Sequence, residues 1–176
     1  SGNKVNFQGK VVIIGGGNVA IDCARVAIRC GASEVSLTCL ESRQEMPAFP
    51  WEIDRAEEEG VKIYPSLAPQ QIIGKDGKVS GLNFKRVKAI EFDTEGRIRP
   101  VLVDGEGMTM EADSVIVAIG QRADLSFLEG ARGLEMTSKG SIQVDPETLG
   151  TNIPGVFAGG DIIGVATVVD AIAAGK

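Results

Sequence analysis

The chain has 176 residues, 43% hydrophobic but only 5% aromatic, and its 24 acidic against 18 basic residues give a net charge of -6. This composition indicates an α/β protein with an aliphatic core, and the acidic balance argues against nucleic acid as a partner. Histidine is absent, which excludes an imidazole base or a histidine-ligated metal within this chain.

The first element is predicted from a continuous apolar run at residues 11–14, which is typical of a strand buried on both faces of a parallel sheet. Three glycines follow, and apolar residues then recur at helical spacing from Val19 to about Arg29, with Gly31 placed as a left-handed cap. A strand, a glycine turn and a helix start therefore stand in the order that directs a helix N-terminus at a diphosphate.

This stretch also fits the pattern G-x-G-x-x-A. Gly15 is expected to make the turn, Gly17 to let the backbone approach the phosphates, and Ala20 to let the helix pack closely on the strand. The alternative is a glycine turn that joins strand to helix and binds nothing. The residues predicted to contact the cofactor here are Gly15, Gly16, Gly17, Asn18, Val19 and Ala20.

A second buried strand is expected at residues 34–40, and Glu41 stands at its end. An acidic residue roughly 20 positions after the glycine turn accepts hydrogen bonds from the adenosine ribose in dinucleotide sites. Ala20 hints mildly at the 2′-phosphorylated cofactor, but Glu41 would repel a 2′-phosphate more strongly, so the sequence favours NAD(H) over NADP(H). Two alternatives stay open: Arg43 would pair a phosphate if it turned inward, and Glu41 would otherwise be a solvated residue.

Between the first strands and the next apolar run, we expect a loop at residues 44–50, a helix at 51–59 and a third strand at 61–64. From about residue 72 to 110 the pattern changes to partly alternating segments. These are separated by turn signals at residues 76–77, 93–96 and 104–107. This spacing predicts a small antiparallel meander inserted into the parallel fold, with no ligand chemistry of its own.

Residues 114–120 form another buried run, expected to be a central strand that rejoins the first sheet. Gly120 ends it where a backbone can lie against a ligand, so Ala118, Ile119 and Gly120 are predicted near the nicotinamide; simple strand termination is the alternative. A domain boundary is placed near Arg122.

The last segment repeats this logic. Short strands are expected at residues 141–144 and 156–158, then two glycines, the carboxylate of Asp161 and a helix over residues 164–174. A carboxylate in this position suits a hydroxyl donor on a ligand, or else it caps the helix.

Four motifs now support a resemblance. They are GGGNVAIDCAR at residues 15–25, SRQEMPA at 42–48, DSVIVAIGQ at 113–121 and TNIPGVFAGGD at 151–161. Together they resemble the pyridine-nucleotide half of the glutamate synthase small (beta) subunit family, flavoproteins of the pyridine nucleotide-disulfide oxidoreductase type. The resemblance implies that the first motif holds the nicotinamide cofactor. It also implies that Gly160 and Asp161 contact FAD.

Two local departures and one larger one limit this transfer. Leu40 and Glu41 stand where the family commonly has two arginines suited to a 2′-phosphate, and Ala123 stands where it often has proline. The βαβ unit that would hold the FAD adenosine diphosphate is not seen, so the chain is interpreted as a fragment that binds nicotinamide dinucleotide modestly, binds FAD poorly and catalyses nothing alone.

The predicted fold is therefore α/β: a Rossmann-like NAD(P)-binding domain at residues 1–122 with an antiparallel insertion, then a partial FAD-domain segment at 123–176. In the full-length protein, hydride is expected to pass from NAD(P)H to FAD, and electrons onward to a partner subunit or iron–sulfur centre. No catalytic side chain is predicted. The rival predictions are a non-catalytic dinucleotide sensor and a disulfide reductase of the same architecture.

Cysteine usage and hydropathy predict the compartment. Cys23, Cys30 and Cys39 fit neither a C-x-x-C redox pair nor a zinc spacing, which favours a reducing environment and offers no redox pair to a disulfide reductase. No apolar stretch reaches the length of a membrane span, and no signal peptide is recognised. We therefore predict a cytoplasmic protein without a membrane span.

Overall fold

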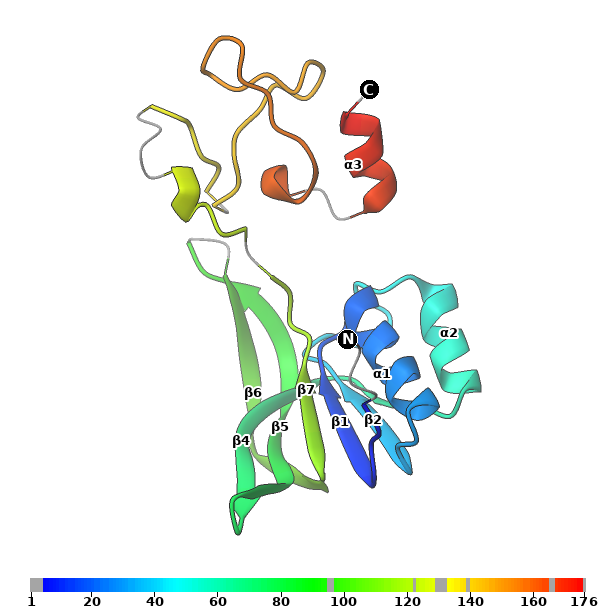
Figure 1. Cartoon of the computed structure of the whole chain (residues 1–176). Helices are drawn as coiled ribbons and strands as arrows, with labels where there is room; N and C mark the ends of the chain where they lie inside the picture. The colour runs from blue at the N-terminus through cyan, green and yellow to red at the C-terminus, as the bar shows by residue number, and fades with distance from the viewer. Residues whose placement is uncertain are drawn as a thin grey trace. The chain divides into compact units, whose positions relative to one another are not determined.

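The computed structural model describes residues 5–94, 97–121, 123–128, 133–138, 140–164 and 167–175. The chain divides into two compact units, one of residues 1–93 and 97–120 and the other of residues 94–96 and 121–176. Figure 1 shows the elements of both, and each unit is described by itself below. The expected boundary at Arg122 falls on a residue outside the described ones.

The first unit contains a four-stranded parallel sheet in the order β3-β2-β1-β7 (Figure 1). The strands are β1 (Lys10–Ile14), β2 (Glu34–Thr38), β3 (Lys62–Tyr64) and β7 (Ser114–Val117). The prediction that the last of them is central was wrong: in the described part of the chain β7 pairs only with β1 and lies at the sheet edge, where Val117 is 58% exposed. Its apolar sequence reflects partial packing on both faces, because Ile116 contacts the helix-side core and Val115 contacts the core on the other face.

Two helices cover one face of this sheet, α1 (Asn18–Arg29) and α2 (Pro50–Glu58). The buried side chains of α1 are mostly alanines, which let its backbone approach Val11 and Ile13 of β1 closely. From α2, Ile53 and Ala56 join the same core cluster. The helix over residues 18–29 and its left-handed glycine, Gly31 at φ +92°, are as the sequence predicts.

An antiparallel sheet in the order β4-β5-β6 covers the opposite face. Its strands are β4 (Leu67–Lys75), β5 (Lys78–Phe92) and β6 (Ile98–Glu111). Leu82 and Phe84 of β5 pack with Val12 and Ile14 of β1, so alternate residues of β1 contact helices on one side and this sheet on the other. The predicted antiparallel insertion is therefore present, although it begins earlier than expected.

The expected turn at residues 104–107 was wrong, because this segment lies inside β6. Lys85 of β5 pairs with Gly107, whereas Val87 pairs with Leu102, so extra residues of β6 bulge out of the ladder. Gly105 has a φ of +75° there, a conformation that suits either a turn or a bulge. The Asp104–Gly105 pair, which suggested a turn, therefore lies in a bulge within the strand and does not end it.

The second unit has little regular structure. It contains the 3-10 turns η1 (Ser126–Leu128) and η2 (Gly160–Ile163) and the helix α3 (Val168–Ala174). The strands expected at residues 141–144 and 156–158 are reduced to single bridges, Met136 to Ile142 and Gly150 to Phe157. The helix expected from Gly164 begins at Val168, because Gly164 adopts φ +86° and closes η2. Nowhere in the described residues is a helix long and apolar enough to cross a membrane.

Candidate functional site

The glycine turn after β1 is fixed by its neighbours. Gly15 has φ +142°, and a Cβ there would collide with the carbonyl oxygen of Ala118. The Gly15 N–H donates to the carbonyl of Thr38 at 2.8 Å, and the Ala118 N–H donates to the carbonyl of Ile14 at 2.8 Å. The turn is therefore held between the ends of β2 and β7, and only glycine fits its first position.

The next two glycines have different surroundings. A Cβ at Gly16 would lie 3.0 Å from the Glu41 Oε2 and 3.0 Å from the Cys39 Cβ, so any larger residue there requires these neighbours to shift. A Cβ at Gly17 would meet no atom within 4 Å, and Gly17 has an ordinary φ of -91°. Nothing within the described fold requires glycine at this position, whereas a ligand that approaches the backbone would require it.

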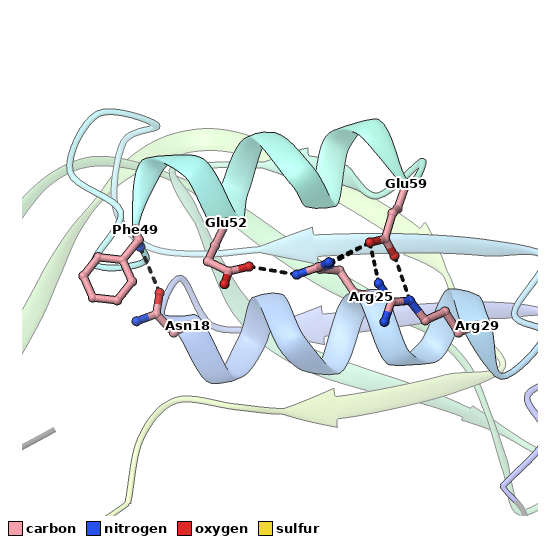
Figure 2. A network of polar contacts seen from close by, with 6 residues as sticks. All are labelled: Asn18, Arg25, Arg29, Phe49, Glu52 and Glu59. Carbon is pink, nitrogen blue, oxygen red and sulfur yellow. Dashed lines mark hydrogen bonds and ion pairs between the residues drawn. The ribbon is translucent and has the colours of Figure 1, made fainter. Parts of the chain in front are cut away.

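The N-terminus of α1 begins at this open glycine. No side chain caps the helix, and in the described part of the chain no group accepts the N–H of Asn18 or Val19. The Asn18 Oδ1 accepts the N–H of Phe49 at 2.9 Å (Figure 2), which ties the following loop to the helix start. Free N–H groups and the positive end of the helix dipole form a site suited to an anion.

A cleft of about 260 Å³ lies beside this turn, at the carboxyl edge of β1, β2 and β7. Glu41 is the one charged residue among those described as lining it, and no cationic side chain of the described residues pairs with its carboxylate. Ligand hydroxyls would therefore find an available acceptor beside an anion site. The full lining is Ile14, Gly15, Gly16, Gly17, Cys39, Leu40, Glu41, Pro47, Leu67, Pro69, Ile98, Ala118, Ile119 and Gly120.

Cys39 is buried in the wall of this cleft. Burial, and then the charge of Glu41, raise the pKa of the Cys39 thiol to about 12. The thiolate is the nucleophilic form of cysteine, so Cys39 stays protonated and unreactive at neutral pH. In the described part of the chain no three residues are grouped as metal ligands would be.

The structure brings most, but not all, of the predicted site residues together. Gly15, Gly16, Gly17, Glu41, Ala118, Ile119 and Gly120 line the cleft, and Asn18, Val19 and Ala20 begin the adjoining helix. Val19 is 67% exposed, and Ala20 is buried against the turn. Arg43 does not line the cleft: its guanidinium contacts Glu57 at 2.8 Å and Asp54 at 3.4 Å.

Sequence reasoning missed the cleft residues that come from the antiparallel sheet, which are Leu67, Pro69 and Ile98. No local pattern could have found them, because their position depends on how that sheet packs across β1.

Gly160 and Asp161 belong to the second unit. Gly160 is buried at φ +75°, and its Cβ position lies 3.4 Å from the Ala171 Cβ. Asp161 is exposed and lines a hollow of about 450 Å³ together with Thr137, Ser141 and Gly164. The side chain of Thr167, and not that of Asp161, caps α3 by accepting the N–H of Asp170 at 3.2 Å. A role for Asp161 as the cap of this helix is therefore excluded.

A parallel sheet, a glycine turn leading into an uncapped helix, and an acidic residue after the second strand define a dinucleotide-binding α/β domain. Residues 2–175 match the family described as pyridine nucleotide-disulphide oxidoreductase, and the chain belongs to that family. This confirms the predicted resemblance, and the family implies a pyridine nucleotide and, in general, FAD as cofactors.

Two relatives show how the chain compares with longer proteins. It is 49% identical to the beta subunit of an NADP(+)-dependent formate dehydrogenase of Moorella thermoacetica, over 97% of this chain and 24% of that protein. It is 40% identical to a glutamate synthase [NADPH] small chain of Azospirillum brasilense, over 98% of this chain and 36% of that protein. The chain thus spans well under half the length of these curated relatives.

Solved structures agree on the fold. A thioredoxin reductase of Lactococcus lactis superposes with a TM-score of 0.78 at 22% identity, over 98% of this chain and 51% of that chain. A thioredoxin reductase of T. acidophilum gives 0.77 at 24% identity, over 94% of this chain and 49% of that chain. At these identities the likeness establishes the FAD/NAD(P)-binding Rossmann-like fold and nothing about substrates.

Proposed function

We propose that the first unit binds a nicotinamide dinucleotide in the cleft beside Gly17. The observation that carries this proposal is the coincidence, within one cleft, of an uncapped helix N-terminus at an open glycine and the Glu41 carboxylate. In the longer protein, bound cofactors would supply the chemistry: the nicotinamide would provide a hydride to FAD, and electrons would continue to a partner subunit or iron–sulfur centre.

The residues of the chain supply position and charge. The N–H groups at the start of α1 donate to the diphosphate, and the Glu41 carboxylate accepts hydrogen bonds from the ribose hydroxyls. The backbone of residues 118–120 borders the nicotinamide end. Cys39 remains a neutral thiol, so it offers no nucleophile to a bound cofactor. The second unit, with Gly160 and Asp161, is proposed to be part of the FAD-binding domain.

We further propose that the preferred nucleotide is NAD(H). A 2′-phosphate facing Glu41 would bring two like charges within about 4 Å, which costs on the order of 4 kcal/mol at an effective dielectric near 20. Arg43, which would offset this repulsion, is engaged by carboxylates of α2. NADP(H) is the competing candidate, because relatives named for NADP(+) or NADPH match nearly the whole chain.

Calorimetric titration of NADH and NADPH tests both proposals. Wild-type chain is expected to bind NADH at least tenfold more tightly than NADPH, and Glu41→Arg to reverse the order, since the substitution replaces repulsion of the 2′-phosphate by attraction. Glu58→Gln, which removes an exposed carboxylate on α2 away from the cleft lining, serves as the charge control. A wild type that prefers NADPH contradicts the role of Glu41, and failure to bind either nucleotide contradicts the function.

Two rival functions are separated by other observations. A disulfide reductase needs a close cysteine pair near the flavin, yet no two of Cys23, Cys30 and Cys39 form a C-x-x-C pair. A non-catalytic sensor has no need of the Gly160–Asp161 segment. A flavin absorption spectrum of the full-length protein decides between sensor and flavoprotein, because only the flavoprotein carries bound FAD.

A further inference from the structure

Arg43 lies close to the proposed ribose site along the chain but is directed away from it. It is the one cationic residue between Cys39 and Pro50 and follows Glu41 by two positions, which span at most about 7 Å of chain. Its Nη2 contacts the Glu57 Oε2 at 2.8 Å and the Asp54 Oδ1 at 3.4 Å, both on α2. The guanidinium that would neutralise a 2′-phosphate is thus already neutralised.

The carboxylates that hold Arg43 are on a helix with a fixed position. Arg25 of α1 contacts Glu52 at 2.8 Å and Glu59 at 2.8 Å, so both ends of α2 are tied to α1 (Figure 2). The bond from Phe49 to Asn18 fastens the residue just before α2 to the start of α1. Glu57 is therefore presented to Arg43 from a preorganised helix, at a low entropy cost.

We propose that Glu57 is a specificity-determining residue that acts through Arg43, retaining it outside the cleft and so disfavouring 2′-phosphorylated nucleotides. The inference rests on the proposed function, since it takes the cleft as the adenosine ribose site. A phosphate monoester and a carboxylate compete for the same guanidinium face. The Arg43–Glu57 pair is half-exposed, with side chains 33% and 44% accessible. The ion pair is therefore weak, and its removal should change the NADPH affinity only moderately.

The test is a double-mutant cycle on the 176-residue chain, with Kd values for NADH and NADPH measured at one ionic strength. Glu57→Gln is expected to tighten NADPH binding by about two- to fivefold and to leave NADH unchanged, as suits the loss of one surface ion pair. Glu57→Gln combined with Arg43→Gln should lose this gain. Glu57→Asp should keep wild-type selectivity, and Glu58→Gln should match wild type.

The outcomes separate the inference from the function on which it rests. The role of Glu57 is overturned if Glu57→Gln leaves the ratio of the NADPH and NADH Kd values unchanged, or if the double variant still binds NADPH more tightly than wild type. In either case, NADH binding by wild type leaves the proposed function intact. Failure of both nucleotides to bind wild type overturns the function and the inference together. Circular dichroism spectra establish that each variant is folded. Asp54→Asn removes the longer of the two contacts of Arg43 and should raise NADPH affinity less than Glu57→Gln does.

Discussion

Gly15 and Gly17 stand two positions apart in one turn, but the described fold requires glycine only at the first of them. Gly15 has a positive φ and lies against the Ala118 carbonyl, so its requirement is internal to the fold. Gly17 has an ordinary φ and open space around it. The same residue type in one motif therefore serves stability at one position and, by our proposal, ligand access at the other.

We predict that Gly17→Ala and Gly15→Ala separate these two requirements. Gly17→Ala should change the free energy of unfolding by less than about 1 kcal/mol while weakening NADH binding at least tenfold, because its Cβ enters the space of the diphosphate. Gly15→Ala should lose about 3 kcal/mol or more of stability through strain and collision. Urea unfolding measures the change in stability, and calorimetry measures the change in NADH affinity. If Gly17→Ala binds NADH as tightly as wild type, the diphosphate does not lie against this turn.

At the scale of elements, α1 and α2 are joined by a network of charged side chains. Glu59 accepts hydrogen bonds from Arg29 and Arg25, and these hold the pKa of its carboxyl below the usual range (Figure 2). The folded state therefore favours the charged form. The resulting stabilisation is present above the unfolded pKa of about 4.3 and is lost as the pH falls through the lower folded value.

We accordingly predict a pH-dependent effect of Glu59→Gln. The difference in urea midpoint between wild type and this variant should be largest above pH 5 and should shrink as the pH falls below about 4.3, because acid protonates Glu59 and abolishes what the substitution removes. Glu58→Gln, one position earlier at the end of α2, is the matched control, and its urea midpoint should show no such convergence with that of wild type. If the difference in urea midpoint between wild type and Glu59→Gln stays constant down to pH 3, the ion pairs of Glu59 contribute no charge-dependent stability.

Sequence patterns located the elements whose signals are local and misjudged those set by tertiary packing. The apolar run of β1 and the periodicity of α1 each specify one structure, and both elements were found where expected. β7 has an equally apolar sequence but lies at an edge, because a strand pattern does not say how many neighbours the strand has. Residues 104–107 had turn chemistry, yet pairing with β5 on both sides carried β6 through them.

The candidate site divides in the same way. The glycine turn, Glu41 and residues 118–120 follow successive parallel strands, whose carboxyl ends share one edge, so their proximity was predictable. Leu67 and Ile98 reach the cleft only because Leu82 and Phe84 anchor the antiparallel sheet on β1. Arg43 was correctly placed near Glu41 in sequence, but the acidic residues of α2 decide where its side chain points.

On the scale of the whole molecule, the two units differ in how much they bury. Residues 11–14 of β1 are almost wholly inaccessible, whereas α3 buries no side chain and leaves Val168, Val169 and Ile172 at least 60% exposed. Local stability follows buried apolar contact.

We therefore predict a wide range of amide exchange rates within one chain. Amides of β1, β2 and α1 should exchange slowest, near the rate of global unfolding, and those of α3 should exchange fastest, because opening α3 exposes almost no new apolar surface. Hydrogen–deuterium exchange with mass spectrometry measures this, with the urea-unfolded chain as the fully exchanged reference. Equal protection of α3 and β1 would show that the two units unfold as one.

The pairing of β1 with β7 has a consequence for biosynthesis. The Lys10 N–H donates to the Asp113 carboxylate at 2.7 Å across 103 positions of the chain, and Ala118 closes over Gly15. During synthesis, β1, α1 and β2 can assemble early. The backbone N–H and C=O groups on the other edge of β1 have no strand partner until β7, near the end of the unit, has been synthesised. The glycine turn after β1 consequently takes its final shape only after β7 has paired, so the proposed nucleotide site is completed last.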